Sequence, residues 1–345
     1  MKLNKTTLAT AVAATLALGM SGQAAASVYA GSRLEVQNLT INITGANGGV
    51  GITGYTFNLD NTARLNGVPD TSAGISTNCN SVGLPGCTVS PASPLTANAA
   101  NAPGSNPLRV DGAANNFDFF GPVISKDKTY ANSDSEIKTA QLVDGVPSSA
   151  VQITETEVAG TGTAQSSTTV QSNTSFTFTF DIGAGGGSFV LDFDADPDLY
   201  VAVDTLNLIG AFAQANTGGT FTLTSNNGTS VQWTPNGVAG GFTSCTGATC
   251  VEDNDEESLS NTIGLPSGNP NSAGISDTRS ANDLGFSDFG ITVNGLASGS
   301  YALTLKTDTS VNVVQSVQRV PEPGMIALLG IGFAGLGFMT RRRKV

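Results

Sequence analysis

The stretch Phe176-Thr177-Phe178-Thr179-Phe180 decides the fold class, because apolar and polar residues alternate strictly along it. Successive side chains of a β-strand point to opposite faces, so the alternation predicts a strand with three phenylalanines on one face. Gly185-Gly186-Gly187 follows and predicts a hairpin turn, and residues 188–193 predict the next strand. The centre of the chain is therefore predicted to be β-structure.

Similar short runs recur on both sides of this centre. They cover residues 33–59, 220–224, 231–233, 289–293, 301–305 and 311–314, whereas residues 199–215 fit a strand better than a helix. Gly and Asn turns separate the runs, which predicts an all-β, antiparallel β-sandwich or jelly roll with long Gly/Asn/Ser-rich loops. A β-solenoid is the alternative, although no repeat of about 20–50 residues supports it. Whether the body forms one domain or two stays open.

Residues 61–116 are rich in Asn, Gly, Ser, Ala and Pro and predict a long loop region that hides short strands. Two local cysteine pairs, Cys79 with Cys87 and Cys245 with Cys250, close short loops. Four cysteines allow three connectivities, and we expect the local one. In an oxidising compartment each bridge would stabilise the fold by roughly 2–3 kcal/mol.

The first 26 residues have the order of a secretory signal peptide. Lys2 and Lys5 precede an apolar stretch from about Leu8 to Met20, and Ala24-Ala25-Ala26 supplies the small residues of a cleavage site. We therefore expect export, with cleavage before Ser27 and a folded body of residues 27–319.

The last 26 residues combine three elements in order. Pro321-Glu322-Pro323 comes first, residues 325–339 are apolar, and Arg341, Arg342, Arg343 and Lys344 close the chain. The apolar segment predicts one short transmembrane helix of about 22 Å, less than the roughly 30 Å of a hydrocarbon core. The basic cluster would stay cytoplasmic, which places Pro-Glu-Pro as extended, accessible backbone on the outer side.

This tail, residues 320–345, resembles the PEP-CTERM sorting signal of exosortase-dependent bacterial surface proteins. The resemblance implies a transient stay in the inner membrane and processing by an exosortase. It also implies a Gram-negative cell envelope or extracellular matrix as the destination, with exopolysaccharide as an associated partner. A permanent single-span anchor is the alternative interpretation.

Composition narrows the function of the body. The chain has 15 Lys and Arg against 27 Asp and Glu. Six of the 15 cations and no acids lie in residues 1–26 and 324–345, so the remaining mature part, residues 27–323, carries nine cations against 27 acids, a net charge of −18. This charge argues against nucleic acid as a partner. No histidine is present, which excludes Ser-His-Asp and Cys-His catalysis and predicts a non-enzymatic protein, although a carboxylate-based glycosidase stays open.

Two acidic segments are candidate cation sites. Asp192, Asp194, Asp196 and Asp198 alternate and would share one strand face, similar to the opening of an EF-hand loop. Pro197 stands where that loop needs glycine, and Val203 stands where it needs glutamate, so a solvated acidic strand is favoured over calcium. The second segment, residues 252–257, is interpreted as a solvated loop. No other cofactor is expected.

These observations favour an exported structural or adhesive protein associated with exopolysaccharide in a biofilm. A secreted carbohydrate-binding or carbohydrate-cleaving sandwich is the alternative.

Overall fold

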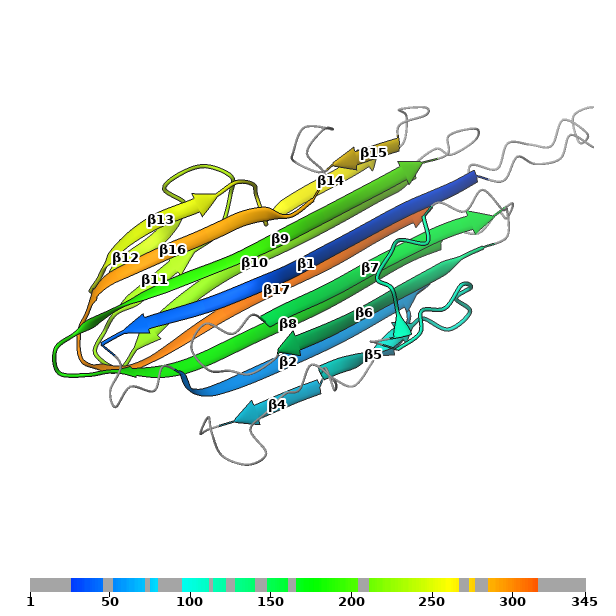
Figure 1. Cartoon of the computed structure of the whole chain (residues 1–345). Helices are drawn as coiled ribbons and strands as arrows, with labels where there is room; N and C mark the ends of the chain where they lie inside the picture. The colour runs from blue at the N-terminus through cyan, green and yellow to red at the C-terminus, as the bar shows by residue number, and fades with distance from the viewer. Residues whose placement is uncertain are drawn as a thin grey trace, which may run out of the picture.

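The computed structural model describes residues 26–45, 52–71, 75–79, 95–111, 114–121, 128–139, 148–160, 166–203, 211–266, 273–276 and 285–315. They form two antiparallel sheets that pack face to face, with long strands running the length of the molecule (Figure 1). The predicted antiparallel β-sandwich is confirmed. The predicted transmembrane helix, and the signal peptide apart from Ala26, lie outside the described residues.

The first sheet, sheet A, has the order β13 (Thr249–Asp255), β16 (Ser287–Leu296), β9 (Gly187–Val203), β1 (Ala26–Thr44), β7 (Ser148–Gly160), β6 (Tyr130–Thr139) and β5 (Leu95–Asn101), with β15 (Ala273–Ser276) also pairing with β9. The second sheet, sheet B, has the order β12 (Phe242–Thr246), β11 (Ser230–Trp233), β10 (Phe212–Ser225), β17 (Gly299–Gln315), β8 (Ser166–Ile182), β2 (Ile52–Leu65) and β3 (Val68–Thr71). In sheet B, β14 (Asn261–Pro266) pairs with β10, and β4 (Ile75–Cys79) pairs with β2.

Strand β8 confirms the alternation that predicted it. Phe176, Phe178 and Phe180 are at most 1% exposed and face the interior. The glycine-rich turn after β8, however, is not a hairpin, because β8 belongs to sheet B and β9 to sheet A. The turn crosses from one sheet to the other and contacts Gly45, just after β1, whose carbonyl accepts from the Gly183 N–H at 2.8 Å. A Cβ on Gly187 would lie 2.1 Å from the Thr44 carbonyl oxygen, so this close approach requires glycine.

The interior divides into two apolar clusters. One is rich in aromatic residues and includes Phe57, Phe193 and Trp233; the other is built mainly from alanine and valine, such as Ala213 and Val311. Between them lies a belt of buried, inward-facing hydroxyl and amide side chains: Ser32, Asn61, Ser135, Gln152, Thr154, Ser172, Thr174, Thr217, Thr307 and Thr309.

The polar belt also joins the two sheets. Ser135 Oγ donates to Asn61 Oδ1 at 3.2 Å, and Ser32 Oγ donates to the Asn216 carbonyl at 2.7 Å. These bonds satisfy groups whose burial would otherwise be costly.

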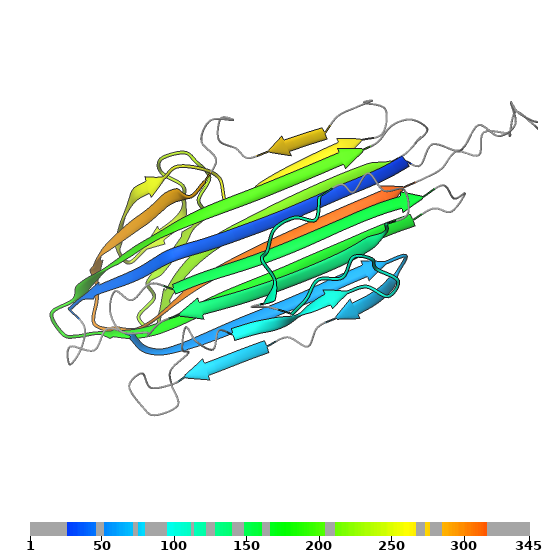
Figure 2. The same ribbon diagram turned by 45° about the vertical axis from the view of Figure 1, so that its right-hand side comes forward.

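The start of β1 and the end of β17 lie at the same end of the sandwich, which we call the terminal end (Figures 1 and 2). Val28 of β1 and Val313 of β17 belong to the same alanine- and valine-rich cluster there. The aromatic cluster occupies the opposite end, the far end. The first and last strands of the described body therefore have their chain-terminal residues, Ala26 and Gln315, at the same end.

Residues 61–116 contain the short strands that were expected within them. Strand β2 continues to Leu65, and β3, β4 and β5 follow. Cys79 ends β4, but Cys87 lies outside the described residues, so the first cysteine pairing stays a prediction. After β5, the described residues 102–111 and 114–121 contain no strand, and we call them the strap.

Candidate functional site

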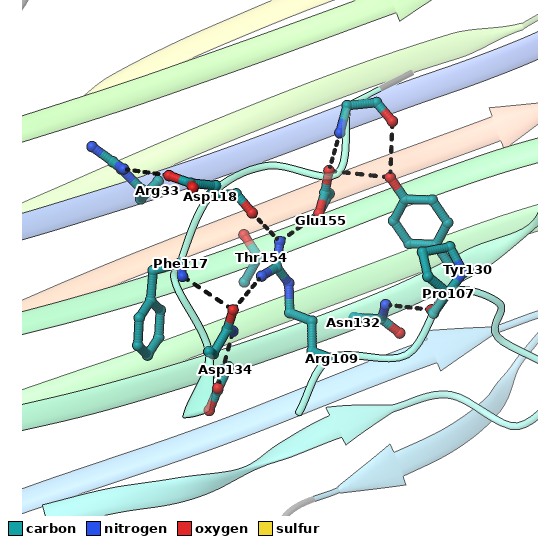
Figure 3. A network of polar contacts seen from close by, with 12 residues as sticks. Arg33, Pro107, Arg109, Phe117, Asp118, Tyr130, Asn132, Asp134, Thr154 and Glu155 are labelled. Atoms are coloured by element: carbon teal, nitrogen blue, oxygen red, sulfur yellow. Dashed lines mark hydrogen bonds and ion pairs between the residues drawn. The ribbon is translucent and has the colours of Figure 1, made fainter. Parts of the chain in front are cut away.

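The strap crosses the outer face of sheet A and is held there by a buried ion pair. Arg109 Nη2 of the strap lies 2.5 Å from Glu155 Oε2 on β7, and both side chains are 0% exposed. The guanidinium also lies over the ring of Phe120, 4.5 Å from its centroid. Figure 3 shows Arg109 extending from the strap toward the carboxylate of Glu155. We call this arrangement the latch.

Glu155 is surrounded by donors from both strands and strap. Its Oε1 accepts from the Tyr29 hydroxyl at 2.8 Å and from the Gly121 backbone N–H at 2.9 Å. It also accepts from the Tyr130 hydroxyl at 3.1 Å (Figure 3). Burial, and next the Glu155 charge, raise the pKa of Tyr29 and of Tyr130 well above the ordinary tyrosine value. Both phenols therefore stay protonated and act as donors. Each oxygen of the Glu155 carboxylate thus has a partner within the protein.

The rest of the strap is fixed by amide side chains. Asn101 binds the backbone of Arg109 through both ends of its amide, at 2.8 and 3.0 Å. Asn115 Oδ1 accepts from Arg109 Nη1 at 3.2 Å, and Asn115 Nδ2 donates to Asp134 Oδ2 at 3.1 Å. Gly31 of β1 lies beneath the strap, where a Cβ would come within 2.8 Å of the Phe119 ring. These contacts indicate that the polar side chains around Arg109 hold the strap on sheet A.

The four aspartates predicted to share a strand face do so on the outer side of β9. Asp196 and Asp198 both pair with Arg33, at 3.1 and 3.0 Å. Asp194 Oδ2 accepts from Asn38 Nδ2 at 2.6 Å. Burial, with the nearby charge of Asp253, raises the pKa of Asp192. The guanidinium of Arg33 thus supplies the positive charge beside two of these carboxylates.

Within the described ranges, no group of three or more His, Cys, Asp or Glu side chains is arranged to hold a metal ion. Calcium at Asp192, Asp194, Asp196 and Asp198 stays a prediction. A comparison of melting temperatures in EDTA and in millimolar calcium tests it, because a ligand that binds the folded state raises stability.

The second acidic segment is more ordered than its interpretation as a solvated loop suggests. Glu252 accepts from the Trp233 indole N–H at 2.5 Å and from the backbone of Gly241 at 3.0 Å. Asp255 accepts from the backbone N–H groups of Asn236 and Gly237, at 3.0 and 3.1 Å. These carboxylates hold the loop after β11.

The predicted Cys245–Cys250 disulfide is present at the same edge. Cys245 lies on β12 of sheet B and Cys250 on β13 of sheet A, so the bridge joins the two sheets.

The outer face of sheet B carries a regular array of hydroxyl and amide side chains. Thr56, Thr177, Thr304 and Thr222 come from four neighbouring strands and lie side by side in register, a row that we call the threonine row. Adjacent strands are about 4.8 Å apart, which sets the spacing of the row. The next row places Asn58 opposite Ser175, with a hydrogen bond of 3.1 Å, and the third row from the threonine row places Asn216 opposite Ser310, also at 3.1 Å.

A hollow of about 370 Å³ lies on this face near the far end. Its lining comes from four strands and the turn after β10: Thr53, Thr179, Phe180, Asp181, Thr224, Ser225, Asn226, Ser300, Tyr301 and Ala302. Ser300 Oγ donates to Asp181 Oδ1 at 2.6 Å, and Thr53 Oγ1 donates to Thr179 Oγ1 at 3.2 Å. Most of the lining residues carry a hydroxyl or amide group, Asp181 adds one carboxylate, and Phe180 and Ala302 add apolar surface.

The sequence did not predict the latch, and it predicted only part of the hydroxyl and amide array on sheet B. Arg109 and Glu155 are 46 residues apart and belong to no motif. The outward threonines, by contrast, are the polar half of the alternation that predicted β8.

Comparison with known proteins concerns the tail. The PEP-CTERM protein-sorting motif matches residues 319–344. The chain carries a PEP-CTERM sorting motif. It supports export of the chain and processing at the membrane by an exosortase. The six predicted sorting residues, Pro321, Glu322, Pro323, Arg341, Arg342 and Arg343, fall inside the match, although their structure lies outside the described residues.

The comparisons carry no argument about the fold or function of the body. No curated protein gives a significant match. A solved structure of the infectious bursal disease virus Gx strain aligns over 94% of this chain and 75% of its own, at 12% identity. Its TM-score of 0.08 carries no argument about fold or function. In the part of the chain that the structure describes, which leaves out the tail, no helix is long and apolar enough to cross a membrane.

Proposed function

We propose that the mature protein is a non-enzymatic, structural or adhesive component of the Gram-negative cell surface or extracellular matrix, associated with exopolysaccharide. The observation that carries this proposal is the PEP-CTERM motif at residues 319–344, which begins four residues after β17 ends at Gln315. Export and exosortase processing would determine where the protein is delivered, and the β-sandwich is the part that is delivered.

The geometry of the body supports a surface role. A tail held in the membrane would draw the terminal end of the sandwich toward the bilayer, because β17 ends there. Strand β17 has 17 residues, which at about 3.3 Å each extend roughly 56 Å. The far end, with the hollow on sheet B, would then point away from the membrane.

The arrangement of charged groups supports a non-enzymatic role. Glu155 is buried, accepts hydrogen bonds from Tyr29 and Tyr130, and pairs with Arg109, which holds the strap. Asp181 is the single carboxylate among the residues that line the hollow, whereas glycosidases use two carboxyl groups about 5–10 Å apart. This composition favours binding over cleavage at the hollow.

Mass spectrometry of the mature C-terminus tests the proposal. In cells with the exosortase, we expect the surface or medium fraction to end upstream of Arg341. A variant with Arg341, Arg342 and Arg343 changed to glutamine should stay in the membrane fraction, and Lys306→Gln, on the exposed face of sheet B, is the matched control. Surface-exposed protein that retains Arg341 to Lys344 would contradict processing.

The second candidate is a secreted carbohydrate-binding protein, favoured by the hydroxyl and amide array on sheet B. A glycan array together with a hydrolysis screen separates binding from cleavage. Release of reducing sugar would show that the protein is an enzyme.

A further inference from the structure

We propose that the outer face of sheet B binds an uncharged polysaccharide, with the polymer lying on the threonine row and seated in the hollow at the far end. This inference rests on the proposed association with exopolysaccharide and names the surface and the chemical class of the ligand. Three observations carry it: the side chains of the face, the hollow, and the distribution of charge.

The face offers paired donors and acceptors at fixed positions. Each hydroxyl can donate one hydrogen bond and accept others, as sugar hydroxyls do. Thr177 Oγ1 and Thr304 Oγ1 lie 3.0 Å apart, so neighbouring strands hold each other's side chains in place. Because these groups are ordered before a ligand arrives, binding costs less conformational entropy.

The hollow gives the flat face a point of attachment. Its volume of about 370 Å³ lies within the range of small-molecule sites, roughly 300–1,000 Å³. Asn226 Oδ1 accepts from the Ser300 backbone at 3.3 Å, and its amide nitrogen is a further donor. Asp181 has a second carboxylate oxygen beyond its bond to Ser300 Oγ. A sugar unit that enters the hollow therefore meets both donors and acceptors.

Charge selects the class of polymer. The mature protein has a net charge of −18, which repels anionic polymers over the whole surface. On the face itself, Asp308 follows Lys306 on the same strand, β17, and Asp60 of β2 lies in the same row as Asp308, so the described part of this face has no basic patch to offset the repulsion. The hydroxyl and amide array therefore favours an uncharged polymer. Many weak contacts along one chain would add through multivalency.

The outer face of sheet A does not offer the same surface. The strap covers the part over β6 and β7, and the exposed part of β9 carries the four aspartates. An exposed position there, Asn42 on β1, provides a matched control for a charge placed on sheet B.

The test is affinity gel electrophoresis of the folded body, residues 27–315, and of the full mature protein in parallel. The probes are three uncharged polymers (dextran, hydroxyethyl cellulose and galactomannan) and one anionic polymer, alginate. The variants are Thr179→Glu at the hollow, Thr304→Val in the threonine row, and Asn42→Glu as control, each checked by its melting temperature.

We expect retardation by at least one uncharged polymer and none by alginate. Thr179→Glu should weaken binding at least tenfold and Thr304→Val severalfold, while Asn42→Glu binds like the parent. Binding that survives both sheet B variants, or a preference for alginate, would overturn the surface and the ligand class while leaving matrix association standing. Retardation by none of the four polymers would also overturn this inference, and the mature C-terminus then decides the proposed function separately.

Discussion

The outer faces of the two sheets are built from strands with the same alternation of side chains, but their outward side chains have different roles. On sheet A, Glu155 and Tyr130 point outward and are then buried again by the strap. On sheet B, Thr177 and Thr304 point outward and remain at the surface. The difference teaches that an outward position in a sheet can carry either stability or recognition, depending on what covers it.

The largest expected effect is a loss of stability when the ion pair under the strap on sheet A is broken. Arg109→Met should destabilise the protein by about 3–5 kcal/mol, because it leaves the Glu155 carboxylate buried without its cation. Urea unfolding measures the change. Lys306→Met, an exposed cation on sheet B, should change stability by less than about 0.5 kcal/mol. An equal loss of unfolding free energy in the two variants would contradict the stabilising role assigned to the covered face of sheet A.

Next in size is the bridge between the sheets. Replacing Cys245 and Cys250 together by serine should lower the free energy of unfolding by about 2 kcal/mol, since the bridge closes a short loop. Urea unfolding of the double variant, compared with the oxidised parent, measures this loss. A double variant as stable as the oxidised parent would contradict a stabilising role of the bridge.

A smaller loss of stability tests whether the hydrogen bonds to Glu155, and not only its ion pair with Arg109, hold the strap. Tyr130→Phe removes one donor to Glu155 and should cost about 1.5 kcal/mol, because hydrogen bonds to charged groups are stronger than neutral ones. Calorimetry at pH 7 compares it with Thr304→Val on the open face, which should cost less. A tyrosine variant as stable as the parent would mean that the strap needs only the ion pair.

The smallest effect is a gain on the exposed part of sheet A. Burial and Asp253 raise the folded-state pKa of Asp192, so protonation favours the folded protein. The ionised carboxylate therefore costs stability at neutral pH, and this cost disappears as the pH falls below the unfolded pKa of about 3.9. Asp192→Asn should raise the melting temperature at pH 7 and leave it unchanged near pH 3. A variant that is less stable at pH 7 would indicate that the carboxylate has a favourable partner.

How much the sequence predicted follows from the range of each interaction. Alternation is local, so the strands around Phe178 and the outward position of its threonine neighbours could be predicted. Sheet membership is not local: Gly185-Gly186-Gly187 has the residues of a hairpin turn, but β9 pairs with β1, more than 140 residues away, and the turn crosses between sheets.

The latch was beyond prediction for the same reason. Arg109 sits in a segment without periodicity, and nothing near it in sequence marks Glu155 as its partner. The aspartates of β9 were predicted correctly to share one face, but no local pattern indicated that Arg33 of β1 would lie beside Asp196 and Asp198. The sorting motif, in contrast, is readable because its three elements are contiguous.

One paired measurement tests the division between the faces most directly. Unfolding free energy and binding to the uncharged polymer are measured on Arg109→Met and Thr179→Glu at a temperature where both variants are folded. We predict that Arg109→Met loses about 3–5 kcal/mol of stability and keeps its affinity, while Thr179→Glu keeps its stability and loses at least tenfold in affinity. Loss of affinity in Arg109→Met with binding intact in Thr179→Glu would contradict the assignment of recognition to sheet B.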